Sequence, residues 1–434
     1  MKKFNLAIVQ YGGITYSAMI DLALLFDKSR FNVFYFWCHP GKELFSSFEH
    51  IPVSQSYVSD QINKMTKAGV ESVEFSVGKR FVPDPIMPWF DTDFFDKFKS
   101  ASIDCIFTWR AGRPEYPYTH LNVPIVEWNI FGMADASPNL MRSLAISPLC
   151  KELYIKNGGE SKKSTVQYVP VNISDEAGNL REKLSIPEDA IVCGMHQRPE
   201  RGIFSPISIN AIHNVARNTK KKIYFILLGG SELYSDHAKL VGLRNFIHLP
   251  YETNRKNIDI FLNTLDIYTH SRCDGETLGR VLQEAMIHKL PIISHTAQWN
   301  AHIETIGAGG RVVSNERDYS SELLAWINNR EQARSVGLRG YAEAIRKYSS
   351  ESAIKMIQNQ IIEAISDWRA IPDKVKNRHI KLSKNINYLY LIRFFAIQFY
   401  NKLMVLIFGS RGSAIVLYSQ QFFNRTKRLL RTYK

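Results

Sequence analysis

Residues 265–294 combine two short apolar segments with one amphipathic segment, and this pattern strongly limits the fold. Residues 265–270 (LDIYTH) and 291–294 (PIIS) have the length and apolar content of buried strands. Between them, a turn that contains Gly279 precedes an apolar-periodic segment that predicts a helix. A strand, a helix and a second strand predict a βαβ unit, whose loop lies at the carboxyl end of a strand. Open α/β sheets bind their ligands at such loops.

The same alternation of apolar strands and helices extends through most of the chain. With 434 residues, of which 45% are hydrophobic, the chain is long enough for two α/β domains with sizeable cores. Residues 172–183 are polar and rich in turn-forming residues, so we expect a linker there. Strands that alternate with helices predict parallel sheets that are covered on both faces. The strands are expected at 4–10, 32–37, 72–76, 104–108, 123–127, 144–147, 166–169, 190–194, 222–228 and 245–249.

Two glutamates flank the turn, and their spacing suits a ligand with hydroxyl groups at both ends. Glu276 precedes the expected helix, and Glu284 lies inside it, roughly 8 to 12 Å away at about 1.5 Å of rise per residue. The backbone N–H groups of residues 277–279 form a candidate anion site at the helix N-terminus. Because carboxylates accept hydroxyl hydrogen bonds, the arrangement suits a nucleotide sugar. The alternative is a surface helix that carries two solvated acids.

The Glu-x7-Glu spacing, with E-x-x-G at its start, resembles the retaining group 1 glycosyltransferases (family 4). The resemblance implies a GT-B fold, in which two Rossmann-like domains face a cleft. It further implies that Glu276 contacts the donor sugar as a catalytic residue and that Glu284 holds the ribose. Thr277 and Leu278 stand where the family usually has Gly-Phe. The backbone donors of Thr277, Leu278 and Gly279 are still expected to bind the donor.

The resemblance covers about residues 1–370 and divides the chain into three parts. Residues 1–172 are expected to form the acceptor domain, and residues 186–370 the nucleotide-sugar domain. In GT-B proteins the late helices cross back onto the first domain, so the same is expected here. Residues 373–434 are left as a C-terminal tail.

A second stretch, residues 195–202 (MHQRPERG), resembles the diphosphate clamp of the same family. There a strand ends in Gly-Arg, and a lysine follows several residues later. Met195 departs from this pattern, while Arg201 stands where the lysine is expected. Arginine binds phosphate through two hydrogen bonds, so the resemblance implies that Arg198 and Arg201 bind the donor and stabilise the leaving diphosphate. Whether Arg198 substitutes for the missing arginine stays open, as does a functional or structural role for His196.

Three further positions are candidate donor contacts. Tyr251 follows the strand at 245–249, where family members often place the nucleotide base. Gly12 and Gly13 follow the first strand, in a loop that lines the cleft of many GT-B proteins. The alternative for the two glycines is a tight turn only. The G-x-G-x-x-G fingerprint of dinucleotide-binding proteins is absent.

Two charged motifs of the first domain admit two interpretations. Asp91-Thr92-Asp93 has the D-x-D pattern that binds metal in the other major glycosyltransferase fold. Because it directly precedes an apolar-periodic helix, we interpret Asp91 or Asp93 as its N-cap, and we expect no metal or other cofactor. Arg110 and Arg113 follow a strand, where they hold an anionic group or are solvated.

Net charge is concentrated at the C-terminus. Of the formal charge of +14, residues 373–434 carry +12, and the remaining residues carry +2. Residues 420–431 place basic and polar side chains on one helical face and Phe422, Phe423, Leu429 and Leu430 on the other. Such a helix is typical of an anionic membrane interface. The alternative is packing against the protein body or a partner. Aromatic residues opposite the cations disfavour nucleic acid.

Cysteine usage and the N-terminus favour a location on the cytoplasmic side. Five cysteines are dispersed without metal-ligand spacing, which suits a reducing compartment. Residues 4–13 are too short and polar for a secretory signal. Together with the tail, these features predict a cytoplasmic protein that is peripheral on the inner face of the membrane.

These observations predict a glycosyltransferase that moves a sugar from a nucleotide sugar to a lipid-linked or cell-surface glycan. Retention of configuration is implied by the family only. One alternative is a GT-B protein that binds sugar nucleotides or partners without catalysis. Met195 favours it, and so does Asn129, which stands where many family members have a histidine. Another is a GT-B nucleotide-sugar epimerase, which needs acid and base residues that the sequence does not locate.

Overall fold

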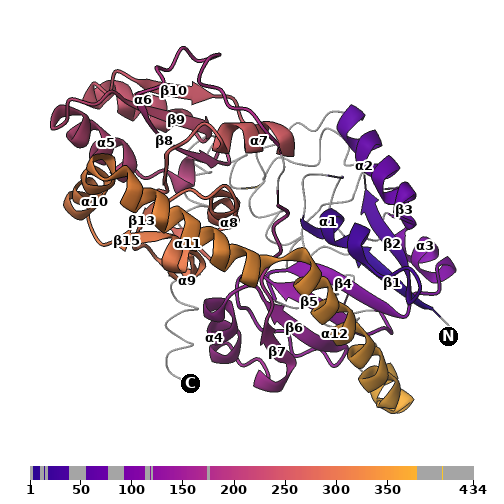
Figure 1. Ribbon diagram of the computed structural model, residues 1–434. Helices are drawn as coiled ribbons and strands as arrows, with labels where there is room; N and C mark the ends of the chain where they lie inside the picture. The colour runs from indigo at the N-terminus through magenta and orange to yellow at the C-terminus, as the bar shows by residue number, and fades with distance from the viewer. Residues whose placement is uncertain are drawn as a thin grey trace.

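The chain forms two α/β domains that lie side by side (Figure 1). The prediction of a GT-B architecture with two Rossmann-like domains is confirmed. The structure is a computed structural model. It describes residues 3–9, 14, 18–38, 55–76, 92–112, 118, 121–173, 176–378 and 403.

The first domain is built on a parallel sheet whose described strands follow the order β3-β2-β1-β4-β5-β6-β7. Its strands are β1 (Phe4–Val9), β2 (Phe31–Cys38), β3 (Val70–Phe75), β4 (Cys105–Arg110), β5 (Ile125–Asn129), β6 (Leu140–Ala145) and β7 (Ser164–Val166). Its helices are α1 (Ala18–Leu25), α2 (Gln55–Lys67), α3 (Phe94–Ser100) and α4 (Pro148–Lys156).

Strand β1 shows why this sheet is covered on both faces. Successive side chains of a strand point to opposite faces. Leu6 and Ile8 accordingly belong to one buried cluster, which contains the apolar side of α1. Ala7 and Val9 belong to another, which contains Phe94 and Phe98 of α3. A continuous apolar run such as β1 is what a sheet with two covered faces requires.

The second domain repeats the architecture with the described strand order β10-β9-β8-β11-β13-β15. Its strands are β8 (Ile191–Gln197), β9 (Ile223–Gly229), β10 (Phe246–Leu249), β11 (Ile267–Thr269), β13 (Ile292–His295) and β15 (Gly310–Val313). Its helices are α5 (Ile207–Arg217), α6 (Glu232–Val241), α7 (Arg255–Leu262), α8 (Arg280–Ile287), α9 (Ala301–Ile306), α10 (Glu316–Asn328) and α11 (Arg330–Tyr348).

Helix α12 (Ser350–Ala370) returns from the second domain and packs on the first (Figure 1). Ile357, Ile361 and Trp368 are buried in the first domain's core. At its polar edge, Asp367 accepts a hydrogen bond of 2.7 Å from Arg142 of β6. This is the crossing that the resemblance implied, and it ties the end of the described chain to the first sheet.

In both sheets the strand order reverses direction at one point. This point lies between β1 and β4 in the first sheet and between β8 and β11 in the second. The loops on either side of such a point run to opposite faces of the sheet, which leaves a crevice at the strands' carboxyl ends. The residues that follow β1, β4, β8 and β11 are therefore the ones to inspect for a site.

Several sequence predictions lie outside the described residues: Gly12, Gly13, Asp91, Arg113 and residues 379–434 except 403. Residues 373–378 of the tail are helical. In the described ranges, no helix has the length and apolarity needed to cross a membrane. Asp93 precedes α3 at the N-cap position, but its side chain accepts a hydrogen bond of 2.6 Å from the backbone N–H of Ser76.

Candidate functional site

A cleft of about 760 Å³ lies between the two domains. Among the described residues, its two walls differ in chemistry. The first domain contributes apolar side chains: Val9, Ala18, Met19, Trp109, Ile130, Phe131 and Ile146. The second contributes most of the polar lining, including Arg198, Glu200, Tyr251, Arg272, Asp274, Glu276, Arg280 and Glu284.

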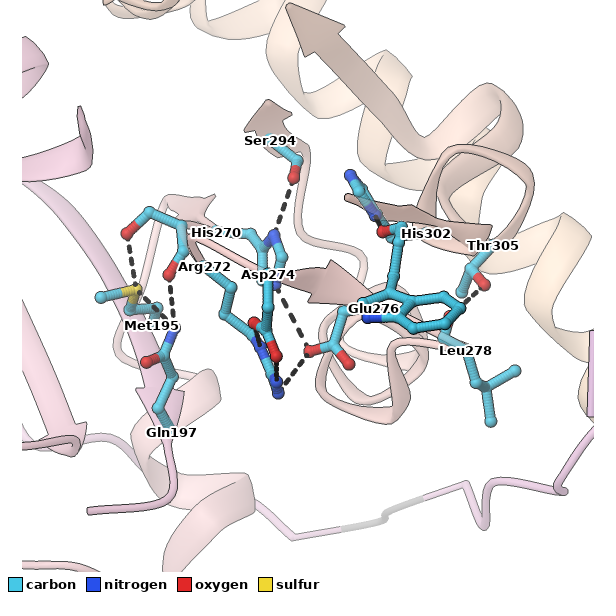
Figure 2. Close-up of polar contacts among 12 residues, drawn as sticks. Met195, Gln197, His270, Arg272, Asp274, Glu276, Leu278, Ser294, His302 and Thr305 are labelled. Carbon is cyan, nitrogen blue, oxygen red and sulfur yellow. Dashed lines mark hydrogen bonds and ion pairs between the residues drawn. The ribbon is translucent and has the colours of Figure 1, made fainter. Parts of the chain in front are cut away.

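Glu276 lies in the cleft on a short strand of its own, β12 (Gly275–Glu276), which pairs with β14 (Trp299–Asn300). Its side chain is 14% exposed. Oε1 accepts a hydrogen bond of 3.2 Å from Arg272, and His270 Nε2 lies 3.6 Å from the same oxygen (Figure 2). Burial alone would raise the pKa of this carboxyl, but His270 and Arg272 outweigh it and lower the pKa.

Arg272 is held between two acids at the same end of the cleft. Its guanidinium donates to both carboxylate oxygens of Asp274, at 3.0 and 2.8 Å, and also to Glu276 (Figure 2). Burial opposes the charge, yet the two carboxylates raise the pKa of Arg272. Neither Arg272 nor Asp274 was predicted from the sequence. Their position in the loop between a strand and Glu276 was the available signal.

Glu284 lies on α8 and also lines the cleft, but its carboxylate is already engaged. Its side chain is 4% exposed. His196 contacts Oε2 at 2.8 Å, while Arg255 and Arg280 contact Oε1 at 2.8 and 3.2 Å. Burial would raise the pKa of Glu284, yet these groups hold the pKa far below its usual range. The histidine left open by the sequence analysis thus has a defined contact in the cleft.

Residues 277–279 join Glu276 to α8 and line the cleft. Leu278 is buried in the first domain's core, although it belongs to the second domain. Its carbonyl accepts a hydrogen bond from Thr305. Gly279 precedes the first residue of α8 with φ of 87°, a left-handed conformation that favours glycine. The glycine of the E-x-x-G pattern therefore shapes this turn, and Leu278 anchors it to the opposite domain.

The residues of the expected diphosphate clamp are placed differently from one another. Met195 is fully buried within β8, which continues to Gln197, and Arg198 follows directly and lines the cleft. Arg198 forms an ion pair of 2.8 Å with Glu200. Arg201 instead forms an ion pair of 2.8 Å with Glu232, is 64% exposed, and is not among the residues that line the cleft.

Tyr251 lines the cleft near Arg198 and Glu284, and its burial raises the pKa of the phenol. Within the described residues, the structure therefore brings together Arg198, Tyr251, Glu276, residues 277–279 and Glu284. It does not bring Arg201 to them.

Arg110 does not hold a cleft anion, nor is it solvated, so both interpretations of this residue were wrong. Its side chain is fully buried and donates to Glu127 at 2.7 Å and to Asp135 at 3.2 Å. Asn129 is also buried and bonds Glu127 and Ser143. These polar groups form hydrogen bonds and ion pairs with one another, because buried charges require partners. The signal for this cluster was Glu127, an acid inside an otherwise apolar strand.

Gly275 occupies a position at which no other residue fits without a shift of the backbone. Its φ is 74°, and a Cβ there would lie 2.1 Å from the carbonyl oxygen of Trp299. We expect Gly275→Ala to separate β12 from β14, to displace Glu276 by about 1 Å, and to lower the rate of the chemistry in this cleft about 100-fold. Gly178→Ala is the matched control, because Gly178 also has positive φ but has open space around it. Equal rates for the two variants would refute this role.

The strand orders and the cleft define a class, the GT-B fold. HepE of Anabaena in complex with UDP is similar, with a TM-score of 0.61 at 15% identity, over 83% of this chain and all of that one. A glycosyltransferase of Rickettsia africae has a TM-score of 0.61 at 13% identity, over 84% and 99%. WaaG, a glycosyltransferase involved in lipopolysaccharide biosynthesis, has a TM-score of 0.56 at 12% identity, over 81% and 99%. No curated protein sequence matches the chain.

Residues 179–343 match the family model described as "Glycosyl transferases group 1". The resemblance to group 1 glycosyltransferases that was inferred from the Glu-x7-Glu spacing is therefore confirmed. The match lies on the second domain, which contributes both glutamates. Sugar transfer is the activity that this family indicates.

Proposed function

We propose that the protein transfers a sugar from a nucleotide sugar to a glycan or lipid-linked acceptor, with retention of configuration. The observation that carries the proposal is that Glu276 and Glu284 line one cleft on either side of the loop 277–279. A donor whose diphosphate meets this loop would place its sugar near Glu276 and its ribose near Glu284. The solved structures of HepE with UDP and with UDP-glucose support a nucleotide sugar as the ligand class.

In the proposed reaction, the bond between the anomeric carbon and the diphosphate oxygen breaks, and a bond from that carbon to an acceptor oxygen forms. The acceptor's proton passes to the leaving diphosphate. Arg198 and the backbone N–H groups at the start of α8 would stabilise the developing negative charge. Glu276 would accept hydrogen bonds from the donor sugar. Arg201 has a second proposed role at the diphosphate, which requires it to leave Glu232.

The function is tested with a panel of nucleotide sugars that begins with UDP-glucose. The first readout is the shift in melting temperature, because a ligand that binds only the folded protein stabilises it. The second is release of the nucleoside diphosphate, with and without glycan and lipid-linked acceptors. A specific shift and acceptor-dependent release are expected. No shift with any donor would overturn the proposal.

A non-catalytic sugar-nucleotide-binding protein is the second candidate. Both cations of the expected clamp already have carboxylate partners, since Arg198 pairs with Glu200 and Arg201 with Glu232. Donor binding without release of the nucleoside diphosphate, under every acceptor condition, would favour this candidate over transfer.

The acceptor domain and tail suggest where the reaction takes place. The apolar cleft wall of the first domain suits the uncharged face of a sugar or the start of a lipid carrier, and the basic tail suits an anionic membrane. The proposed location is therefore the cytoplasmic face of a membrane, on which the protein is peripheral.

The membrane role predicts a loss of lipid binding when the tail loses its charge. We expect the full-length chain to float with phosphatidylglycerol vesicles and not with phosphatidylcholine vesicles. Replacing Arg425, Lys427, Arg428 and Arg431 together with glutamine should abolish flotation, at about 1 kcal/mol per charge. A chain cut after Pro372 should behave like this variant. Equal flotation of all three chains would remove the tail from the proposal.

A further inference from the structure

His270 lies directly behind Glu276 and lies outside the residues that line the cleft. It follows β11, and its side chain is 1% exposed. Its Nδ1 lies 2.7 Å from Ser294 Oγ of β13, and its Nε2 points towards Glu276 (Figure 2). Nε2 is a buried polar atom that makes no hydrogen bond within the described residues. A buried polar group of this kind is costly unless a partner comes within reach.

Ser294 can determine which ring nitrogen of His270 carries the proton. When the Ser294 hydroxyl donates to Nδ1, the neutral ring carries its hydrogen on Nε2. That N–H is directed at Glu276 Oε1. The donor groups of Ser294 and His270 thus point the same way, from the buried hydroxyl on β13 towards the carboxylate of Glu276 in the cleft.

The contacts of Glu276 are unequal between its two oxygens. Arg272 and His270 both face Oε1, at 3.2 and 3.6 Å. Oε2 has no partner among the described residues. Holding one oxygen from behind leaves the other to accept a hydroxyl of a ligand in the cleft.

We infer that His270 is a positioning residue, which orients Glu276 towards the donor sugar through a proton that Ser294 holds on Nε2. The inference rests on the proposed function, in which Glu276 contacts the donor. The separation of 3.6 Å exceeds normal hydrogen-bond length. A small rotation of the carboxylate on donor binding closes it, because hydrogen bonds at catalytic sites often shorten only in the complex.

Three substitutions separate this role from simple packing. Glutamine carries its amide N–H near the position of Nε2, asparagine carries it near Nδ1, and leucine carries none. We expect His270→Gln to keep kcat/KM for the donor within about threefold. His270→Asn and His270→Leu should lower it about 10- to 100-fold, as for a lost hydrogen bond to a charged group. The KM for the acceptor should not change.

The acid side of the pH–rate profile gives a second readout. The other charged or titratable groups that face Glu276 are Arg272 and Asp274 from its own loop, Tyr268 from β11 and His302 from α9. They remain in place in His270→Leu, while burial continues to favour the protonated carboxyl. The pKa of Glu276 should therefore rise, and the acid limb should move to higher pH. A loss of packing alone would lower the rate without moving this limb.

Ser294→Ala tests the role of the His270 tautomer independently if the His270 variants fold poorly. It should lower kcat/KM in the wild-type background and have no further effect in His270→Gln, because glutamine has no tautomer to fix. His302→Gln is the control. The His302 ring lies 5.7 Å from that of His270, but its nitrogens contact the backbone carbonyls of Trp299 and His295. It should move the acid limb less than His270→Leu does, because His302 lowers the pKa of Glu276 less than His270 does.

Failure of this inference and failure of the proposed function give different results. If wild-type protein transfers sugar, Glu276→Ala does not, and His270→Leu and Ser294→Ala both keep wild-type rates and pH profiles, the positioning role is overturned and the function stands. If wild-type protein and Glu276→Ala release nucleotide equally slowly, the proposed function itself fails. Reduced activity in His270→Leu with recovery in His270→Gln supports the inference.

Discussion

Glu276→Ala should abolish sugar transfer while the protein stays folded. The side chain is partly exposed to the cleft and is held by Arg272 and His270, so its removal leaves the backbone of β12 intact. Loss of a group that contacts the reacting sugar should lower kcat at least about 100-fold. Initial rates of nucleoside diphosphate release measure the effect, and circular dichroism reports the fold.

Glu276→Gln refines the result, because it keeps the shape and removes the charge. The lowered pKa means that Glu276 is ionised at neutral pH. The wild-type rate should therefore fall at acidic pH as this carboxylate becomes protonated, whereas the glutamine variant should lack that limb. Glu182→Ala, at an exposed position in the turn before the second domain, is the matched control. Normal turnover in Glu276→Ala would contradict the assigned role.

Glu284→Ala should lower both activity and stability. His196, Arg255 and Arg280 all contact this carboxylate, the first two at 2.8 Å, and its removal takes one partner from each of them. Breaking a buried ion pair by removing one partner costs about 3–5 kcal/mol. The second domain should therefore unfold at a lower urea concentration, and donor binding should weaken. Glu276→Ala is the comparison, and it should lower the unfolding midpoint less, because Arg272 keeps Asp274 as a partner.

The stability effect has a defined pH dependence. Because the pKa of Glu284 is lower in the folded state than in the unfolded chain, its stabilisation is present above about pH 4.3. It is lost as the pH falls through the folded-state pKa. The difference in unfolding free energy between wild type and Glu284→Gln should thus be constant near neutrality and shrink in acid. A difference that grows in acid would show that the pairing does not stabilise the fold.

The sequence predicted the sheets because their signals are local. Apolar runs such as residues 4–10 and 222–228 are short, bounded by turns and alternate with helices, which is enough to indicate two parallel sheets. The spacing of Glu276 and Glu284 is also local, because only a short turn and the first part of α8 separate them. Both glutamates could therefore be assigned to one cleft before the sheet order was known.

The remainder of the site depends on contacts that no spacing encodes. Arg255 reaches Glu284 from another helix, 29 positions earlier in the chain, and its charge alone did not distinguish it from solvated arginines. Arg201 matched the family position, yet its side chain pairs with Glu232. Arg110 was expected after a strand, but it is the last residue of β4 and is paired with Glu127 and Asp135. Which acid an arginine meets is decided by the tertiary fold.

The most direct measurement is a crystal structure with the nucleotide sugar that gives the largest thermal shift. The sugar ring should lie in the cleft with a hydroxyl within about 3.2 Å of Glu276 Oε2. The ribose should lie on the side of Glu284, and the diphosphate should face residues 277–279. A donor bound outside this cleft, or bound within it with its sugar away from Glu276, would contradict the assignment of the donor site.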